Sequence, residues 1–237
     1  MRWNTETRNM ARTLYELAGA DPELRFSPYC WRTRFALAHK GLEVEGQPWR
    51  FTEADRLAFS GQGLVPVLVD GDTVLHDSWA IATWLEINHP EPSLFRGAAA
   101  TTRFINAWAD SVLHPALSRL ILLDIHDCLA AKDQAYFRTS REARFSQTLE
   151  AVQAGRDRDI LTFRKTLQPL RMTLSAQPWL GGEAPAYADY IVLGSLQWAR
   201  CVSSFRLLAQ DDPVFAWRKR GFALFGGMAL AAKGYEP

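Results

Sequence analysis

The stretch that decides the fold is residues 65–88, VPVLVDGDTVLHDSWAIATWLEIN. Two short apolar runs, Val65–Val69 and Thr73–Leu75, flank an Asp-Gly pair, and Asp-Gly between apolar runs is typical of a β-hairpin. Asp77 or Ser78 then caps a helix that reaches the end of the stretch. The stretch is therefore predicted to form two antiparallel strands followed by a helix.

The residues before this stretch alternate between strand and helix patterns. Arg12–Leu17 is a strand candidate, and Pro28–Lys40 is predicted to be a helix because proline suits a first turn and Gly41 stops it. Val44–Phe51 is a second strand candidate, and Thr52–Ser60 is predicted to be a loop or a short helix. The whole order is β-α-β-α-β-β-α, which is the plan of an α+β, thioredoxin-like domain.

The pattern changes at His89–Pro92, where two prolines prevent a helix from continuing. Beyond it the strand pattern disappears, so we expect a thioredoxin-like domain over residues 1–95 and an all-helical domain over residues 96–237. We expect Pro115 and Pro169 to kink the first two of its helices. The expected helices cover Ala98–Leu129, Ser140–Ser175, Ala186–Leu208 and Pro213–Arg220, with a short helix after Gly226.

The composition excludes several classes of partner. The chain of 237 residues has 27 basic and 26 acidic residues, a balance that does not attract nucleic acid or an anionic membrane. It has no apolar run long enough to span a membrane, and its start does not resemble a signal peptide. Cys30, Cys128 and Cys201 lie too far apart for a metal or disulfide motif. We therefore expect a cytoplasmic protein that binds no metal, nucleic acid or membrane.

Ser27 is the first candidate site residue, because it precedes the helix that begins at Pro28. The start of a helix presents free backbone N–H groups and a partial positive charge, both of which stabilise an anion. The serine hydroxyl can donate one further hydrogen bond, so a bound thiolate fits this position. The alternative is that Ser27 only caps its helix, as serine often does.

Two residue pairs add to this candidate site. A proline inside an apolar strand, as in Val65-Pro66, removes a ladder donor, and a cis bond there would turn the neighbouring backbone outward to pair with an extended peptide. Asp77-Ser78 at a helix start can hold a zwitterion, because the hydroxyl and N–H groups take a carboxylate while the aspartate takes an ammonium. The alternatives are an edge-strand proline and an ordinary helix cap. The joint order of these features points to one site.

These segments resemble the glutathione transferase superfamily, and the resemblance covers nearly the whole chain. It rests on SPYCWR at Ser27–Arg32, VPVL at Val65–Leu68 and DSWAIA at Asp77–Ala82. Within the superfamily, the chain is similar to bacterial β-aryl-etherases and related fungal ether-processing transferases. That narrower similarity rests on Tyr136–Glu142, Tyr187–Tyr190 and Gln197–Arg200.

The resemblance implies a role for each residue of the candidate site. Ser27 is the catalytic residue that activates the thiol of glutathione. Val65 pairs through its backbone with the cysteinyl unit of glutathione, and Pro66 is the cis residue. Asp77 and Ser78 hold the γ-glutamyl end.

Several positions depart from the family pattern or extend it. Many members have glutamine at the position of Leu64, so that contact to glutathione is lost or supplied elsewhere. Arg50 or Arg56 could reach the glycine carboxylate of glutathione, the alternative being a solvated loop arginine. Asp189 matches a buried capping aspartate, but Ala186 stands where many members have serine or threonine, so we expect a helix start that is less well fixed.

The function implied is that of a glutathione transferase with glutathione as co-substrate. Its thiolate attacks a hydrophobic, aromatic electrophile, which in the ether-cleaving branch is the β-carbon of an aryl ether. The helix from Ala98 is expected to line the electrophile pocket, with Trp108, Ser111 and His114 as candidate residues. His114 could give a proton to the leaving phenolate, or it could be a packed histidine beside a kink. The family also implies a homodimer.

Two alternative functions stay open. The fold could serve as a non-catalytic module that binds glutathione or another protein. The protein could also be a thiol–disulfide oxidoreductase that acts through Cys30. Relatives that reduce disulfides carry their nucleophilic cysteine at the position of Ser27, whereas Cys30 lies one helical turn further and is expected to face the core.

Overall fold

The computed structural model describes residues 12–236. Residues 1–11 lie outside this range. They include the start of the expected first domain and most of the segment that is expected not to be a signal peptide. The elements of the first half are β1 (Thr13–Leu17), α1 (Pro28–His39), β2 (Glu45–Trp49), a 3₁₀ helix (Ala54–Ser60), β3 (Val67–Asp70), β4 (Thr73–His76) and α2 (Ser78–Asn88).

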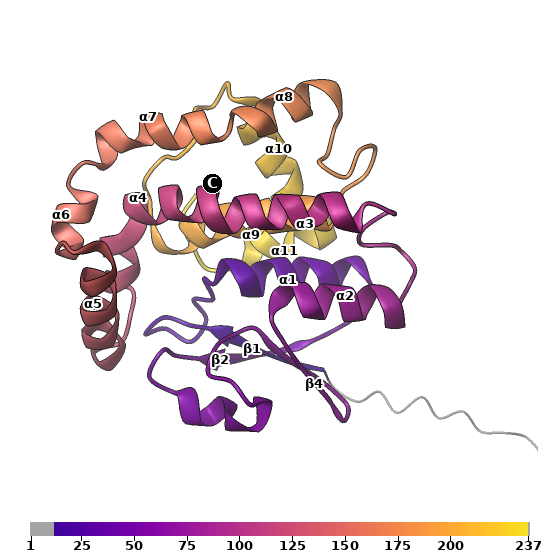
Figure 1. Ribbon diagram of the computed structural model, residues 1–237, viewed down its shortest axis with the longest axis horizontal. Helices are drawn as coiled ribbons and strands as arrows, with labels where there is room; N and C mark the ends of the chain where they lie inside the picture. Colours follow the sequence, from indigo (N-terminus) through magenta and orange to yellow (C-terminus); the bar gives the residue numbers. More distant parts are fainter. Residues whose placement is uncertain (1–11, 237) are drawn as a thin grey trace, which may run out of the picture.

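The four strands form one mixed sheet in the order β2-β1-β3-β4. β2 runs parallel to β1, whereas β3 is antiparallel to both β1 and β4. Leu14 of β1 lies opposite Leu68 of β3, and both side chains are fully buried. Helices α1 and α2 cover one face of the sheet (Figure 1). The expected fold class is confirmed, with a 3₁₀ helix in the place of the second predicted helix.

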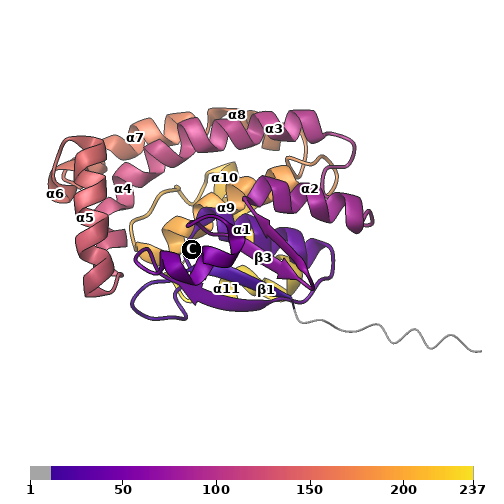
Figure 2. The same ribbon diagram turned by 60° about the horizontal axis from the view of Figure 1, so that its bottom comes forward.

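The second half is entirely helical within the described residues. Its elements are α3 (Ala99–Trp108), a π-helical turn (Ala109–Leu113), α4 (His114–Asp127), α5 (Ala131–Phe145), α6 (Leu149–Gln153), α7 (Arg156–Thr166), α8 (Gln168–Ala176), α9 (Tyr187–Val202), α10 (Pro213–Phe222) and α11 (Leu224–Ala231). α3 and α4 form one long rod with α7 and α8 outside it, while α5 and α6 extend from the far end of α4 (Figures 1 and 2).

Helix α9 connects the two halves, because it packs directly against α1. The two backbones meet at Gly194, where an added Cβ would lie 2.7 Å from the carbonyl oxygen of Pro28. Any larger residue would push α9 away from the first turn of α1. The position of that turn, and with it the position of Ser27, is therefore set by contact with the helical half.

The prediction of one helix over Ser140–Ser175 is wrong. α5 begins earlier, at Ala131, and ends at Phe145, before Ser146, whose φ of 53° is left-handed. Thr148 then caps the short helix α6 by accepting a hydrogen bond from the N–H of Ala151 at 3.2 Å. These breaks arise from local capping and backbone geometry that the apolar periodicity does not report.

The two proline predictions have different outcomes. Pro115 lies in the first turn of α4, two residues after the π-helical turn, where the backbone of the rod stays right-handed helical, so the predicted kink stays a prediction. Pro169 does not kink a helix; it lies in the first turn of α8, where its missing N–H removes no hydrogen bond. The predicted helix that begins at Ala186 ends at Val202 instead of Leu208, and residues 203–206 have no regular structure.

Asp189 fixes the start of α9 more firmly than the sequence indicates. Its carboxylate accepts hydrogen bonds from the backbone N–H groups of Leu180, Gly181 and Ala186 at 2.8, 2.9 and 3.0 Å. It accepts a fourth at 3.0 Å from the indole Nε1 of Trp217. The missing hydroxyl at Ala186 is thus offset by three donors from outside the capping box, and the expectation of a loose helix start is wrong.

We expect Asp189→Ala to lower the free energy of unfolding by about 3 kcal/mol or more, because it leaves buried donors without an acceptor. Urea unfolding followed by circular dichroism measures this loss. Asp211→Ala is the matched control, since Asp211 is exposed. A loss below about 1 kcal/mol for Asp189→Ala would show that the helix start does not depend on this carboxylate.

Candidate functional site

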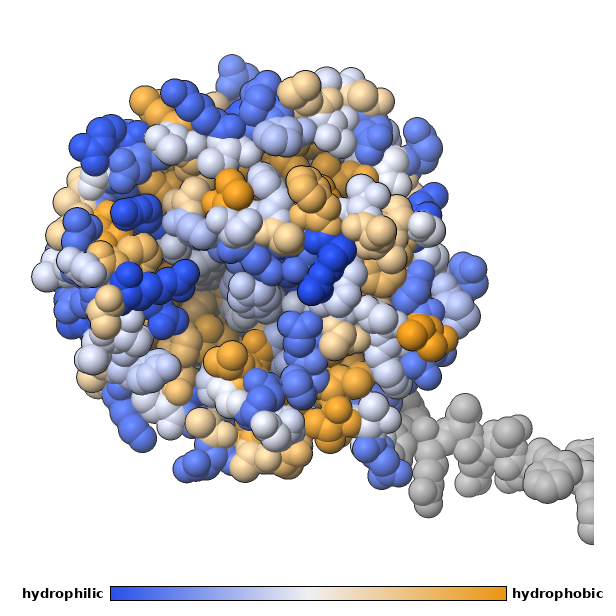
Figure 3. Space-filling model, in the orientation of Figure 1, coloured by the Kyte–Doolittle hydropathy of each residue, from blue (hydrophilic) through white to orange (hydrophobic). Residues whose placement is uncertain are grey.

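A cavity of about 310 Å³ lies between the start of α1 and the helices α4 and α5. The face of the molecule is hollowed at this place, left of centre (Figure 3). Most of the lining is apolar and aromatic, which suits a small organic ligand. The lining residues are Leu17, Phe26, Ser27, Pro28, Tyr29, Trp49, Phe51, Leu64, Val65, Asp110, His114, Pro115, Ser118, Leu122, Ile125, Phe137, Arg141, Arg144, Phe145 and Trp198.

Ser27 is the N-cap of α1 and lines this cavity. Its Oγ accepts a hydrogen bond from the backbone N–H of Cys30 at 3.3 Å, so the capping role is real. Capping uses the oxygen as an acceptor and leaves the hydroxyl proton available for donation. The capping and thiol-activating interpretations are therefore compatible.

Val65 and Asp77 lie at one end of the sheet. Val67 of β3 pairs with His76 of β4, which places Pro66 opposite Asp77 just beyond the paired residues. The Val65–Pro66 bond is cis, as the resemblance implies. Within residues 12–236, the backbone N–H and C=O of Val65 make no hydrogen bond to the protein.

The start of α2 completes this corner. The Asp77 carboxylate accepts hydrogen bonds from the N–H groups of Trp79 and Ala80 at 2.9 and 3.0 Å. The carbonyl oxygen of Ser78 accepts one from the Tyr187 hydroxyl at 2.8 Å, which ties α2 to α9. Val65 and Ser27 line the cavity itself, whereas Asp77 and Ser78 lie outside its lining.

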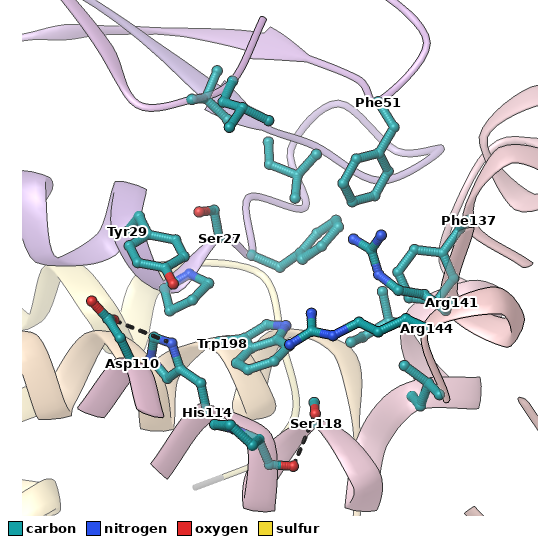
Figure 4. A pocket seen from close by; sticks show the side chains of 18 of the residues that line it. Ser27, Tyr29, Phe51, Asp110, His114, Ser118, Phe137, Arg141, Arg144 and Trp198 are labelled. Atoms are coloured by element: carbon teal, nitrogen blue, oxygen red, sulfur yellow. Dashed lines mark hydrogen bonds and ion pairs between the residues drawn. The ribbon is translucent and has the colours of Figure 1, made fainter. Parts of the chain in front are cut away.

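A buried polar network borders the cavity, and sequence reasoning missed most of it. Arg32 of α1 donates to the side chains of Asn106 and Asp110 at 2.7 and 3.3 Å, and the Asn106 amide donates to Asp110 at 2.9 Å. Asp110 lies on the π-helical turn, which turns its carboxylate toward the cavity (Figure 4). Burial, followed by the negative charge of Asp110, raises the pKa of Tyr29.

His114 lines the cavity, as predicted for the electrophile pocket, but its ring is not placed to give a proton. The Ser195 hydroxyl donates to the Ile191 carbonyl at 2.9 Å, so at 2.8 Å it accepts from Nε2 of His114. Burial and the positive charge of Arg32 lower the His114 pKa to about 3. The imidazole is therefore neutral at physiological pH, and its N–H is already in use.

Trp108 and Ser111 do not line the cavity, so the prediction fails for these two residues. The cavity face of this rod begins at Asp110 and continues through residues 114, 118, 122 and 125, which are spaced by one helical turn. Ser111 is exposed, and its hydroxyl donates to the Ala107 carbonyl at 2.7 Å. The π-helical turn shifts the helix register, and no sequence pattern reports that shift.

Arg50 and Arg56 are not brought to the cavity either. Arg50 donates to the carbonyl oxygens of Gly19 and Ala20 at 3.1 and 3.2 Å. Arg56 donates to the Pro48 carbonyl at 2.9 Å and to Glu53 at 2.7 Å. Both guanidinium groups donate to the segments before and after β2 and lie outside the cavity lining, so their assignment to the glycine carboxylate stays a prediction.

Two other arginines, Arg141 and Arg144 of α5, line the cavity. Their side chains enter it from the side opposite Ser27 (Figure 4). Arg141 belongs to the segment Tyr136–Glu142 that supports the family resemblance, but nothing in its spacing marks it as a cavity residue. Arg141 reaches the cavity because α5 begins nine residues before the predicted helix and folds back toward the sheet.

Cys30 faces the core. Its side chain is 1% exposed, and burial raises the pKa of its thiol to about 12. All three cysteines are free thiols. In the part of the chain that the structure describes, no helix is long and apolar enough to cross a membrane, and no group of acidic, histidine and cysteine side chains could hold a metal ion.

Comparison with protein families agrees with this geometry. Residues 26–87 match the model of the glutathione S-transferase N-terminal domain, and residues 100–207 match that of the glutathione S-transferase C-terminal domain. The chain belongs to the glutathione S-transferase superfamily. The two matches contain Ser27, Val65 and the start of α2, as well as the helices that close the cavity.

Relatives of this chain include glutathione S-transferase Z1 of Arabidopsis thaliana, 43% identical over 68 residues, which is 27% of this chain. That match spans only 31% of the relative's length. Glutathione S-transferase 4 of Zea mays is 27% identical over 168 residues, 69% of each chain. The short span of the first match leaves the activity of the whole protein to be argued from its site.

Solved structures show the same fold along almost the whole chain. The glutathione transferase GSTFuA3 from Phanerochaete chrysosporium has a TM-score of 0.74 and 22% identity, with 92% of each chain covered. The glutathione S-transferase CsGST63524 of Ceriporiopsis subvermispora, solved in complex with glutathione, has a TM-score of 0.74 and 21% identity. It covers 91% of this chain and 96% of its own.

We expect His114 to make the stability of the protein depend on pH. Free histidine has a pKa of about 6.5, whereas His114 in the folded protein has a pKa of about 3. Between these two pH values the unfolded chain binds a proton at His114 and the folded chain does not. Acid therefore favours unfolding. Between about pH 7 and about pH 5, wild type should lose about 2 kcal/mol more stability than His114→Gln, measured by urea unfolding. Equal losses in the two proteins would contradict the lowered pKa.

Proposed function

We propose that the protein is a glutathione transferase that joins the thiol of glutathione to a hydrophobic, aromatic electrophile. The observation that carries the proposal is the placement of Ser27. Its hydroxyl lines a cavity with aromatic sides, at a helix start beside the unpaired backbone of Val65. The superfamily membership supports glutathione as the co-substrate.

Glutathione is an extended peptide, and the corner beside Ser27 offers what such a peptide needs. The free N–H and C=O of Val65 would pair with the cysteinyl unit and direct its sulfur toward Ser27. The Ser78 hydroxyl makes no hydrogen bond to any described residue, so it is available for the γ-glutamyl carboxylate, while Asp77 would hold the ammonium. In this placement, neither Arg50 nor Arg56 is assigned as the partner of the glycine carboxylate.

The site needs to stabilise a thiolate by only a few kcal/mol. A free thiol has a pKa of about 8.5, and lowering it by about two units requires roughly 2.7 kcal/mol. A helix start supplies up to ~2 kcal/mol, and one charge-assisted hydrogen bond supplies ~1.5–3 kcal/mol. Ser27 therefore has only to donate its proton in a hydrogen bond, and it does not act as a base.

The thiolate then attacks an electrophilic carbon held in the cavity. If the substrate is a β-aryl ether, as the similarity to ether-cleaving relatives suggests, the sulfur forms a bond to the β-carbon. The carbon–oxygen bond breaks, and the phenolate leaves with the electron pair. Solvent supplies the proton to the phenolate, since His114 is neutral and hydrogen-bonded to Ser195. Phe26, Phe51 and Trp198 provide aromatic surface for both substrate rings.

The superfamily also supports a homodimer, which we include in the proposal. Exposed apolar side chains on neighbouring helices are compatible with it. Ile87 of α2 is 72% exposed and Phe104 of α3 is 69% exposed. The two helices meet where the Arg103 guanidinium lies 4.8 Å from the centre of the Trp79 ring.

We expect reduced glutathione to bind the wild-type protein and support turnover of chlorodinitrobenzene or a β-aryl ether. Ser27→Ala should lower kcat/KM by roughly 10- to 100-fold, because it removes the donor to the thiolate. The rise of activity with pH should move to higher pH, since the bound thiol becomes harder to ionise. Calorimetry and a stopped assay measure these effects, with Ser204→Ala as the matched control on an exposed serine.

The other outcomes of that experiment are equally informative. Binding of glutathione without turnover of either electrophile would favour the non-catalytic module. An unchanged kcat/KM in Ser27→Ala would show that Ser27 does not take part in the reaction. Absence of binding at millimolar glutathione would contradict the proposal.

The thiol–disulfide oxidoreductase alternative makes a different prediction at Cys30. Because burial raises the Cys30 pKa to about 12, its thiol is protonated and unreactive. We expect Cys30→Ser to keep the transferase activity within about twofold, and native Cys30 to resist alkylation by iodoacetamide while the unfolded chain reacts. Loss of activity in Cys30→Ser, with the fold intact by circular dichroism, would restore the alternative.

A further inference from the structure

The cavity has a cationic side that the proposed thiol chemistry does not use. Arg141 and Arg144 lie one turn apart on α5, and both side chains enter the cavity (Figure 4). The guanidinium of Arg141 points toward Phe51, and that of Arg144 reaches toward Trp198 (Figure 4). Two positive charges therefore face the space in which the second substrate must lie.

These charges are not neutralised by the protein. Among residues 12–236, no carboxylate forms an ion pair with Arg141 or Arg144. By contrast, Arg138 on the same helix is held by Glu142 and Glu150, both at 2.8 Å. Burial, and to a lesser degree the nearby charge of Arg144, lowers the pKa of Arg141. An anion bound between the two guanidinium groups would remove this unfavourable environment.

The acidic side of the cavity cannot supply that anion. Asp110 is the one carboxylate among the described lining residues. It already accepts hydrogen bonds from Arg32 and Asn106, on the opposite side of the cavity from α5. The cavity is thus polarised, with a satisfied carboxylate near α1 and two unpaired cations on α5.

Aromatic rings lie beside Arg141 on this side of the cavity, whereas Arg144 is more exposed. The Arg141 guanidinium lies 4.8 Å from the centre of the Phe137 ring and 5.7 Å from that of Phe51. Arginine stacked on aromatic rings can still present a planar pair of donors to a carboxylate. A flat ring that bears a carboxylate would therefore match both the apolar and the charged parts of this side.

We propose, resting on the transferase function above, that the second substrate is an aromatic electrophile that carries a carboxylate, which Arg141 and Arg144 bind. The ring lies between Phe51, Phe137 and Trp198, with its anionic end toward α5 and its reactive carbon toward Ser27. This arrangement selects acids over their neutral esters and sets the direction in which the substrate enters.

Binding can be tested without any reaction. The probes are 3,5-dinitrobenzoate and its methyl ester, which have no leaving group, titrated by calorimetry into protein saturated with glutathione. Wild type should bind the acid more tightly than the ester. In the double variant Arg141→Gln, Arg144→Gln, affinity for the acid should fall by roughly 10- to 100-fold, while affinity for the ester and for glutathione changes by less than about threefold.

The matched control is the double variant Lys132→Gln, Arg158→Gln. It removes the same charge from exposed positions, the first of them also on α5. It should leave all three affinities within about twofold. Equal losses for acid and ester in the α5 variant would overturn the proposal, because the arginines would then act only as packing surface. A loss confined to glutathione would also overturn it and would assign the pair to the glycine carboxylate.

Turnover separates this proposal from the function on which it rests. With 4-chloro-3,5-dinitrobenzoate, the thiolate forms a bond to the ring carbon and chloride leaves with the electron pair. A preference for the acid over its methyl ester that disappears in the α5 variant supports the proposal. Turnover of the ester that depends on Ser27, without a preference for the acid, overturns it and leaves the transferase standing. Selective binding of the acid without turnover would support the anion site and contradict the transferase function.

Discussion

The structure depends on the contact between α9 and the first turn of α1, where Gly194 lets two backbones meet. A side chain there would strike the Pro28 carbonyl, so this approach is possible only with glycine. The contact holds the start of α1, and therefore the Ser27 hydroxyl, in a fixed position relative to the helical half. Asp189 fixes the first turn of α9, because its carboxylate accepts four hydrogen bonds. The two halves of the chain thus form one site.

Burial of polar groups along this contact shapes the chemistry of the cavity. Arg32 is fully buried, and its two terminal nitrogens donate across the interface to Asn106 and Asp110, whereas its Nε has no partner among the described residues. The charge of Arg32, together with burial, keeps His114 neutral. A neutral histidine leaves the thiolate, once formed, without a nearby acid that could protonate it. This arrangement is compatible with the proposed nucleophilic attack by sulfur, in which solvent protonates the product.

The sequence predicts the first half better than the second for a physical reason. Strands, hairpins and caps depend on neighbours in the chain, so the Asp-Gly turn and the helix start at Asp77 could be placed from local patterns. The π-helical turn before Pro115 and the return of α5 toward the sheet depend on contacts distant in sequence. That is why Trp108 and Ser111 were expected in the cavity, and why Arg141 and Arg144 were not. The contacts of Arg50 and Arg56 could not be predicted either, because their partners are backbone carbonyl oxygens, which no sequence motif marks.

In the proposed function, the start of α1 and Ser27 stabilise glutathione as a thiolate. The most direct measurement is the ultraviolet absorbance of the thiolate in the complex of wild-type protein with glutathione, followed as a function of pH. We expect the bound thiol to ionise roughly two pH units below the free thiol, and Ser27→Ala to reverse most of this shift. A bound thiol that ionises at the pH of free glutathione would contradict the role proposed for Ser27 and the start of α1.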